Sequence, residues 1–155
     1  DMLYPGLQGE QLEDQVFGDL VLLSTGRYMA NQMAYVDAKT YHYHFSYVAS
    51  EKVNKQPGAA HADDIAFVMK TLEVELENVS EKDKQISNLM HNYWVQFAKT
   101  GNPNLPGQPK WTPYNQDNGS VLEIGDTIAL KNNFLNERIN YHINRGTNFL
   151  QSMTK

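Results

Sequence analysis

One helix near the middle of the chain is specified at its start, along its face and at its end. Ser80 can cap the helix, and Glu81 and Asp83 place negative charge in its first turn, where the helix dipole is positive. Gly101 supplies a left-handed stop, and Pro103 prevents continuation. Apolar side chains recur between these ends at spacings of three and four: Ile86, Leu89, Met90, Tyr93, Phe97 and Ala98. The sequence therefore predicts a long helix with one buried face.

Strand patterns occur on both sides of this helix. Residues 41–48 alternate aromatic with polar side chains, which is the period-two pattern of a strand with one buried face. Two short apolar runs, 121–124 and 127–130, are separated by Gly125 and Asp126. Short strand-like runs around a Gly-Asp pair predict a β-hairpin. The chain thus combines one clear strand and a hairpin with several helices.

Three further helical regions are predicted from apolar spacing. The region 12–35 has the helical period but is interrupted around Gly18 and Gly26, so we expect two pieces. A short helix is expected over about 63–76 and a terminal helix over about 134–152.

The bulk composition limits what the chain can be. A length of 155 residues with 41% hydrophobic content predicts a single domain over 1–155 with its own core. A net charge of -5 and only three arginines leave no basic stripe for nucleic acid. No apolar run approaches the roughly 20 residues that span a bilayer, so no membrane span is expected. The absence of cysteine excludes disulfides and thiolate chemistry.

His61 is the strongest candidate for chemistry. It follows a Pro57-Gly58 turn, lies between small alanines and precedes Asp63 and Asp64, which can open a helix. A histidine on such a loop has room to reach a substrate, as a general base must. From local chemistry alone the same run is also typical of an ordinary loop.

Three separated segments resemble the C-terminal third of the type-B carboxylesterase and cholinesterase family of α/β hydrolases. Residues 58–68, Gly-Ala-Ala-His-Ala-Asp-Asp-Ile-Ala-Phe-Val, are similar to the family run around its catalytic histidine. Residues 93–104, Tyr-Trp-Val-Gln-Phe-Ala-Lys-Thr-Gly-Asn-Pro-Asn, are close to the family's Tyr-Trp-x-x-Phe-Ala-x-Thr-Gly-x-Pro-Asn. Residues 111–114, Trp-Thr-Pro-Tyr, resemble a family Trp-Pro-x-Tyr. All three lie in the family's order.

The resemblance implies a C-terminal segment of an α/β-hydrolase fold in which His61 is the base of a Ser-His-Glu/Asp triad. None of the seven serines lies in a Gly-x-Ser-x-Gly elbow. In the family the nucleophile, the acid and the oxyanion loop precede the histidine, so we expect them in a missing N-terminal portion. The isolated chain is expected to be inactive, the complete protein to hydrolyse carboxylic esters, and no cofactor or metal to be needed. Asp64 departs from the family pattern because glutamate is usual there.

Other interpretations compete with this one. The same fold serves cholinesterase-like adhesion proteins that have lost the serine, so a non-catalytic binding module is the alternative. His42 and His44 lie two apart on the predicted strand and could chelate a metal, although packing explains them more simply. Asp19 or Asp37 could orient His61, but Asp19 is expected rather to tether a helix.

The resemblance also has consequences for partners and source. An isolated segment of an α/β hydrolase exposes strand edges and apolar surface, so we expect self-association, either as a homodimer or as a larger species. Animal members of the family usually carry a disulfide in this region, so the lack of cysteine favours a bacterial esterase. The compartment is not determined by the sequence.

Overall fold

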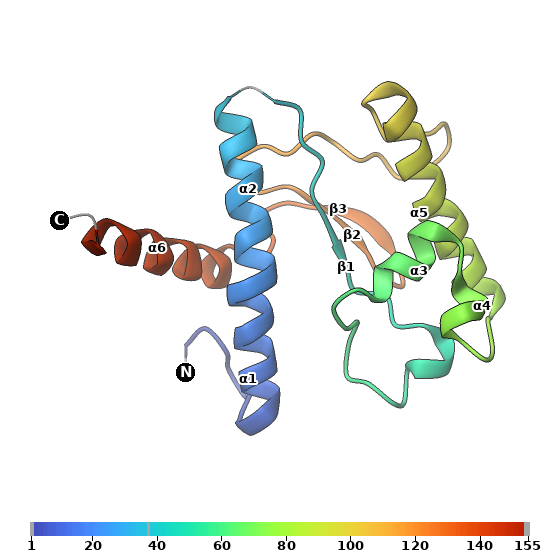
Figure 1. Cartoon of the computed structure of the whole chain (residues 1–155), viewed down its shortest axis with the longest axis horizontal. Helices are drawn as coiled ribbons and strands as arrows, with labels where there is room; N and C mark the ends of the chain where they lie inside the picture. Colours follow the sequence, from blue (N-terminus) through green and yellow to red (C-terminus); the bar gives the residue numbers. More distant parts are fainter. Residues whose placement is uncertain (1, 37, 154–155) are drawn as a thin grey trace. The chain divides into compact units, whose positions relative to one another are not determined.

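The computed structural model describes residues 2–36 and 38–153 (Figure 1). Its elements in chain order are α1 (Gly9–Phe17), the π-helical segment η1 (Gly18–Leu23), α2 (Ser24–Tyr35), β1 (Tyr43–Phe45), the 3-10 helix η2 (Ser50–Lys52), α3 (Asp63–Met69), α4 (Leu72–Glu75), α5 (Glu81–Thr100), β2 (Val121–Ile124), β3 (Ile128–Lys131) and α6 (Asn136–Met153). Each element expected from the sequence has a counterpart here.

The described residues group into two compact units. The first comprises those within 1–42, 113–121 and 131–155, and the second those within 43–112 and 122–130. The first unit therefore contains α1, η1, α2 and α6, whereas α3, α4 and α5 belong to the second. The single-domain organisation stays a prediction.

In the first unit, α1, η1 and α2 follow one another without a break in helical backbone (Figure 1). The expected interruption at Gly18 takes the form of the π-helical segment η1. At its end, the hydroxyl of Ser24, the first residue of α2, donates to the Leu20 carbonyl at 2.6 Å. Gly26 does not interrupt α2; a Cβ there would lie 3.5 Å from Nε2 of His42. The prediction of a helix in this region is confirmed, and the break is a local change of helical type.

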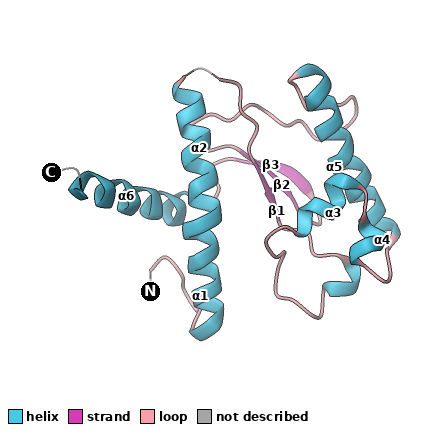
Figure 2. Cartoon of the chain, in the orientation of Figure 1, coloured by secondary structure: helices cyan, strands magenta, loops and turns pink. Residues whose placement is uncertain are grey.

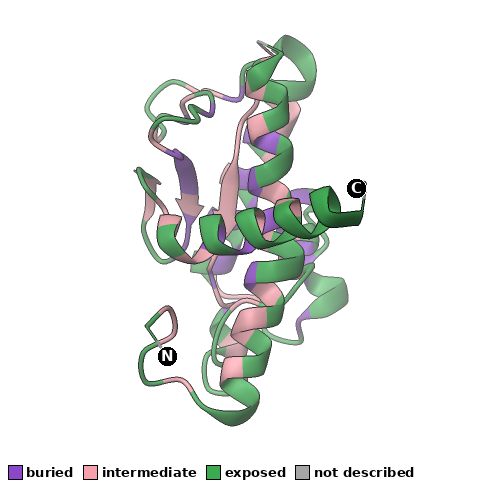
Figure 3. Ribbon diagram, turned by 90° about the vertical axis from the view of Figure 1, so that its left-hand side faces the viewer, coloured by how far each residue is buried: buried purple, intermediate pink, exposed green. Residues whose placement is uncertain are grey.

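The helices of the first unit bury only part of their apolar surface. Helix α6 packs against η1 and α2 through a face that includes the buried Ile139. Most of the surface of α6 is nevertheless exposed (Figure 3). Large apolar side chains of this unit are also exposed to solvent: Phe17, Tyr28, Met29, Met33, Tyr141, Phe149 and Leu150. This unit has more apolar helix surface than it covers itself.

The sheet has the order β1-β2-β3, with β1 parallel to β2 (Figure 2). Only three residues of the predicted 41–48 strand belong to it, and Tyr43 pairs with Leu122 and Phe45 with Ile124. After Phe45, the N–H groups of both Ser46 and Tyr47 donate to the Ile124 carbonyl, at 2.9 and 3.1 Å. Two residues facing one form a bulge, and the bulge ends the ladder early.

The predicted hairpin is confirmed by β2 and β3, which are neighbours in the sheet and are connected by three residues. At Gly125 a Cβ atom would lie 2.6 Å from the hydroxyl oxygen of Ser46, closer than real contacts allow. The close approach of the Ser46 side chain is therefore the reason for glycine in this turn. Leu122 and Ile124 of β2 have no exposed surface.

Helix α5 matches its prediction at both ends. The Ser80 hydroxyl accepts from the Asp83 N–H at 3.1 Å, and the Asp83 carboxylate accepts from the Ser80 N–H at 2.8 Å. This reciprocal pair is a capping box. Gly101 has φ +69° and ends the helix in the left-handed region. Met90 and Tyr93 on the buried face have no exposed surface.

The region predicted as one short helix, 63–76, is two helices. Lys70 adopts φ +58°, which ends α3, and the Thr71 N–H then donates to the Ala66 carbonyl at 3.0 Å. Helix α3 packs on α5. Among the described residues, none of the helices combines the length and the apolar character required to cross a membrane.

Candidate active-site loop

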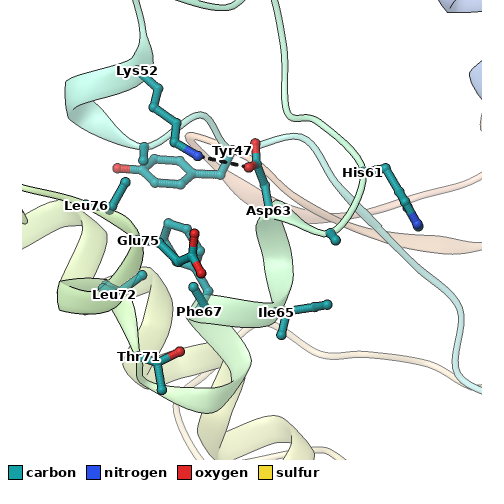
Figure 4. A pocket seen from close by; sticks show the side chains of 13 residues that line it. Tyr47, Lys52, His61, Asp63, Ile65, Phe67, Thr71, Leu72, Glu75 and Leu76 are labelled. Atoms are coloured by element: carbon teal, nitrogen blue, oxygen red, sulfur yellow. Dashed lines mark hydrogen bonds and ion pairs between the residues drawn. The ribbon is translucent and has the colours of Figure 1, made fainter.

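His61 lies in the turn that leads into α3, and its side chain is exposed. The following residue, Ala62, has φ +72°, a left-handed conformation that is unfavourable for a residue with a Cβ. Within the described part of the chain the His61 imidazole makes no hydrogen bond. Both of its ring nitrogens are therefore open to groups from outside this segment. In Figure 4 the ring projects from the loop away from Asp63 and Lys52.

The loop before α3 is held by the carboxylate of Asp63. One carboxylate oxygen, Oδ2, accepts from the Ala60 N–H at 2.9 Å and from Nε2 of Gln56 at 2.8 Å. The other, Oδ1, accepts from Nζ of Lys52 at 3.0 Å. Nε2 of Gln56 also donates to the carbonyl of Gly58 at 2.9 Å. These bonds connect the residues before His61 to the start of α3.

The ionised form of Asp63 is the one that this arrangement favours. Partial burial raises the pKa of the Asp63 carboxyl, but the hydrogen bonds from Gln56, Ala60 and Lys52 and the positive charge of Lys52 outweigh it, so its pKa lies below the usual value. Asp63 therefore remains a carboxylate at neutral pH. The three groups that donate to it, from Lys52, Gln56 and Ala60, therefore all bind a charged acceptor.

Asp83 anchors the other end of this loop. Its Oδ1 accepts from the Tyr47 hydroxyl at 2.7 Å and from the Ser50 N–H at 3.0 Å. Asp83 has no exposed surface. Burial, with the nearby carboxylate, raises the pKa of Tyr47 to about 12, so the phenol stays a donor. The chain leaving β1 is thus fixed to the N-terminus of α5.

Asp64 connects α3 to β1. The Tyr43 hydroxyl donates to Oδ2 of Asp64 at 2.5 Å, and burial followed by this carboxylate raises the pKa of Tyr43. The Tyr43 ring packs edge-on against Trp94, with ring centroids 4.9 Å apart, and Trp111 lies 5.9 Å away. The two tryptophans are packing residues of this aromatic cluster. Asp64 has a partner beyond its place at the helix start.

A cavity of about 310 Å³ lies beside the His61 loop (Figure 4). Buried apolar side chains form part of its lining, namely Tyr47, Phe67, Leu72 and Leu76. Lys52, Asp63 and Glu75 add charged groups to the lining, and His61 contributes to it as well. The loop therefore combines an exposed imidazole with an adjacent hollow of mixed polarity.

The remaining histidines have structural partners. Nδ1 of His91 lies 2.9 Å from the Val68 carbonyl and connects α5 to the end of α3. His142 is 4% exposed, and its Nε2 lies 2.7 Å from the Tyr4 hydroxyl. The ring of His42 packs edge-on against Tyr114, with centroids 5.8 Å apart. No group of three or more potential metal ligands occurs among residues 2–36 and 38–153.

Asp19 is fully buried and tethers the helices of the first unit. Its carboxylate accepts from Nε and an Nη of Arg138 at 2.6 and 2.8 Å, from the Tyr4 hydroxyl at 2.9 Å and from Gln15 at 3.1 Å. These bonds use both carboxylate oxygens, as expected of a helix tether. Asp37, the other carboxylate considered as a partner of His61, lies outside the described residues.

The donors that surround Asp63 could not be identified from the sequence. A signal does exist: Asp63 follows Ala60 by three positions, which is the spacing of a capping box. The pattern lacks the Ser or Thr that normally reveals such a box, and Lys52 lies eleven residues earlier. Spacing alone could not show that the carboxylate turns back toward the loop.

Similarity to known proteins identifies the family of this chain. The model of the carboxylesterase family matches residues 9–142. Bile salt-activated lipase of Rattus norvegicus is 35% identical over 115 residues, covering 71% of this chain and 19% of that protein. Carboxylesterase 1C of Mus musculus is 31% identical over 126 residues, covering 79% of this chain and 22% of that protein. The chain spans about a fifth of the length of these curated relatives.

Solved structures show the fold. A PNB esterase matches with a TM-score of 0.74 and 22% identity, covering 89% of this chain and 29% of that one. A carboxylesterase of Geobacillus stearothermophilus matches with a TM-score of 0.73 and 21% identity, covering 87% of this chain and 28% of that one. The helix-rich chain with its small sheet is thus a segment of an α/β-hydrolase fold. With the family model matching most of its length, this chain belongs to the carboxylesterase family.

Proposed function

We propose that this chain supplies the histidine base of a Ser-His-Glu/Asp triad in a carboxylic-ester hydrolase. The observation that carries the proposal is the exposed imidazole of His61 on a loop that is fixed through Asp63 on one side and Asp83 on the other. A base must be held in place and yet remain open to the nucleophile and the substrate. The nucleophile, the acid and the oxyanion loop belong to the portion of the protein that precedes this segment.

In this role, His61 accepts the proton of the serine hydroxyl as the serine attacks the ester carbonyl. It then returns the proton to the departing alcohol. An imidazole with an unperturbed pKa near ~6.5 can do both around neutral pH. One ring nitrogen faces the serine, and the other is held by the carboxylate of the triad, which fixes the tautomer.

The substrate class follows from the family. The relatives named above are a lipase and a carboxylesterase, and both names denote hydrolysis of carboxylic esters. The cavity beside His61 has an apolar side formed by Phe67 and Leu72. An uncharged or lipophilic ester is the kind of molecule that such surroundings accept.

A fluorophosphonate probe tests the proposal because it labels only an activated serine. We expect no adduct on the isolated 155-residue chain and one adduct per molecule on the complete protein. In the complete protein, His61→Ala should slow labelling at least ~100-fold, since it removes the general base. The control His91→Gln replaces a histidine that only connects two helices.

Three outcomes would contradict the proposal. An adduct on the isolated chain would show that a nucleophile is present within it. Normal labelling of the complete protein with His61→Ala would show that another group is the base. A complete protein that is not labelled at all would favour the alternative, a cholinesterase-like binding module.

Self-association of the isolated segment is part of the same proposal. Phe17, Met29 and Phe149 are each more than half exposed in the first unit. Exposed apolar side chains in such number are more typical of a surface that has lost its cover than of a monomer. Light scattering should detect a dimer or larger species, and a monomer at high concentration would contradict this.

A further inference from the structure

We propose that Asp63 is the positioning residue of His61: its carboxylate fixes the turn that carries the imidazole. The inference rests on the proposed function, because it concerns the same base. Asp63 makes no hydrogen bond to the imidazole, and its carboxylate oxygens accept from Lys52, Gln56 and Ala60, so its effect is exerted through the backbone on either side of His61.

The first step is a reciprocal pair of bonds around the turn. The Ala60 N–H donates to Oδ2 of Asp63 at 2.9 Å, and the Asp63 N–H donates to the Ala60 carbonyl at 3.2 Å. His61 and Ala62 lie between these two bonded residues. The pair closes the turn and compensates for the left-handed backbone of Ala62, with φ +72°.

The second step concerns the carboxylate itself. Lys52 on η2 and Gln56 in the preceding loop hold the two oxygens from different directions, at 3.0 and 2.8 Å. The side chain of Asp63 is 17% exposed, so these bonds are partly shielded from water. A carboxylate held by these two donors can in turn hold the Ala60 N–H in one place.

The neighbouring Asp64 cannot take over this task. Its Oδ2 accepts from the Tyr43 hydroxyl, a bond toward β1 and the aromatic cluster rather than toward the loop. Two successive acidic residues thus have separate tasks, since Asp63 holds the loop and Asp64 holds the helix. The distinction makes Asp63 testable by itself.

Asp63→Asn is the sharpest variant because it keeps the size of the side chain. An amide offers one acceptor oxygen in place of two, and its NH₂ group would face the Lys52 ammonium or the Ala60 N–H, both donors. At least one bond to the loop is therefore lost. Lys52→Met is a milder variant that removes one donor and keeps the carboxylate.

The isolated chain tests the positioning without any catalysis. Hydrogen exchange of the Ala60 amide should be at least ~10-fold faster in Asp63→Asn than in the parent chain, since its charged acceptor is either lost or replaced by a neutral amide oxygen that Lys52 no longer holds. Asp126→Asn, an exposed carboxylate in the hairpin turn, is the matched control and should leave the rate unchanged. Unchanged Ala60 exchange in folded Asp63→Asn would overturn the inference.

The complete protein tests the consequence for chemistry. Misplacing a catalytic group by about 1 Å can cost ~100-fold in rate, so Asp63→Asn should lower kcat ~10- to 100-fold while KM stays nearly constant. Lys52→Met should give a smaller loss, and it serves as the test if Asp63→Asn does not fold. A purely structural role would not separate kcat from KM in this way.

The two proposals fail in different ways. Full activity of His61→Ala would overturn the proposed function and leave the Ala60 exchange result intact. An inactive His61→Ala combined with unchanged kcat in folded Asp63→Asn or Lys52→Met would overturn the role of Asp63 alone.

Discussion

Asp19 in the first unit and Asp83 in the second are both without exposed surface, yet their charges are compensated in different ways. Asp19 accepts two hydrogen bonds from the guanidinium of Arg138, a cation 119 positions away in the sequence. The donors to Asp83 are all neutral and come from Tyr47, Ser50 and Ser80. One carboxylate is neutralised by an ion pair, and the other is solvated by protein dipoles at a helix N-terminus.

The difference shows for which buried carboxylates the partners can be predicted from the sequence. The Ser80-x-x-Asp83 spacing indicates a capping box, so the bonds between Asp83 and Ser80 can be predicted from the sequence. No residue near Asp19 in the sequence indicates that Arg138 is its partner, because the pairing depends on how α6 packs against η1. Only the bonds between Asp83 and Ser80 are therefore written into the local sequence; the bonds of Asp83 to Tyr47 and Ser50, like the Arg138 pair of Asp19, come from the tertiary fold.

The largest effect is expected from Asp83→Ala. Removal of the carboxylate leaves the Tyr47 hydroxyl and the N–H groups of Ser50 and Ser80 without their acceptor. A buried donor such as the Tyr47 hydroxyl costs about 1–3 kcal/mol when it loses its partner, and the N–H groups of Ser50 and Ser80 lie nearer to solvent and can be rehydrated in part, so we expect a loss of about 4 kcal/mol in total. Urea unfolding followed by tryptophan fluorescence measures it, since Trp94 and Trp111 both lie in the second unit.

Asp126→Ala is the control for this variant because Asp126 is exposed on the hairpin turn. Its free energy of unfolding should stay within ~0.5 kcal/mol of the parent value. If Asp83→Ala behaved like this control, water would be replacing the carboxylate at little cost. The contrast with Asp19 would then lose its physical basis.

A smaller loss, about 3 kcal/mol, is expected for Asp19→Ala. Breaking a buried ion pair costs several kcal/mol when the remaining charge has no partner. The Arg138 side chain is 21% exposed, so water can solvate it in part, which places the loss at the low end. Hydrogen exchange of amides in η1 and α6 reports on this unit, which contains no tryptophan.

The double variant Asp19→Leu with Arg138→Met sharpens the comparison. Replacement of a buried pair by apolar side chains of similar size is often neutral, so the stability should largely return. No such rescue is available at Asp83, whose partners include two backbone N–H groups. A double variant as unstable as Asp19→Ala would show that Tyr4 and Gln15, rather than Arg138, carry the stabilisation.

The elements of the fold could be predicted from the sequence wherever local chemistry decides them. Helix α5 has its cap, its apolar face and its Gly101 stop in the sequence. The structure has the cap and the stop, and it buries the face as far as Tyr93 but leaves Phe97 and Ala98 exposed. The strand was predicted too long, because its end depends on a bulge formed against Ile124 of a distant strand. The split of 63–76 into two helices depends on Lys70, whose backbone is in the left-handed region. Lysine has no preference for that region, so the sequence does not indicate the split.

In the candidate site, the catalytic base could be predicted from the sequence, but the interactions that hold its loop in place could not. His61 could be proposed from its flanking residues and from resemblance, and its role as a triad base stays a prediction. Asp63 and Asp64 were assigned to a helix start, and their partners Lys52 and Tyr43 lie 11 and 21 positions earlier. Interactions over such separations follow from packing and not from spacing.

The smallest expected effect is a difference in pH dependence between the unit that contains Asp19 and the unit that contains Asp83. It arises from His142. The Tyr4 hydroxyl donates to Asp19 at 2.9 Å, so it must accept from the Nε2–H of His142, 2.7 Å away. Nδ1 of His142 is then unprotonated, and it is buried without a hydrogen-bond partner within the described residues. Burial lowers the pKa of His142, the charge of Asp19 raises it, and Arg145 and Arg138 lower it further.

The sign of the effect follows from this lowered pKa. A histidine that is kept neutral by the fold stabilises the folded state fully above its pKa in the unfolded chain, ~6.5. This stabilisation is lost as the pH falls from there through the lower pKa of the folded state. Asp83 behaves otherwise. Burial raises the pKa of Asp83, but hydrogen bonds from Ser80 and Tyr47 lower it below the usual value, so its contribution is lost only below about pH 4.

Between pH 6.5 and 5 the first unit should therefore weaken while the second does not. Hydrogen exchange of α6 amides should speed up over this interval, and tryptophan-detected unfolding of the second unit should stay constant. His142→Gln keeps an N–H donor for Tyr4 but cannot titrate, so it should remove the pH dependence of α6. An equal acceleration in the His142→Gln variant would mean that another group senses the pH, and the ion pair of Asp19 would not be coupled to a histidine.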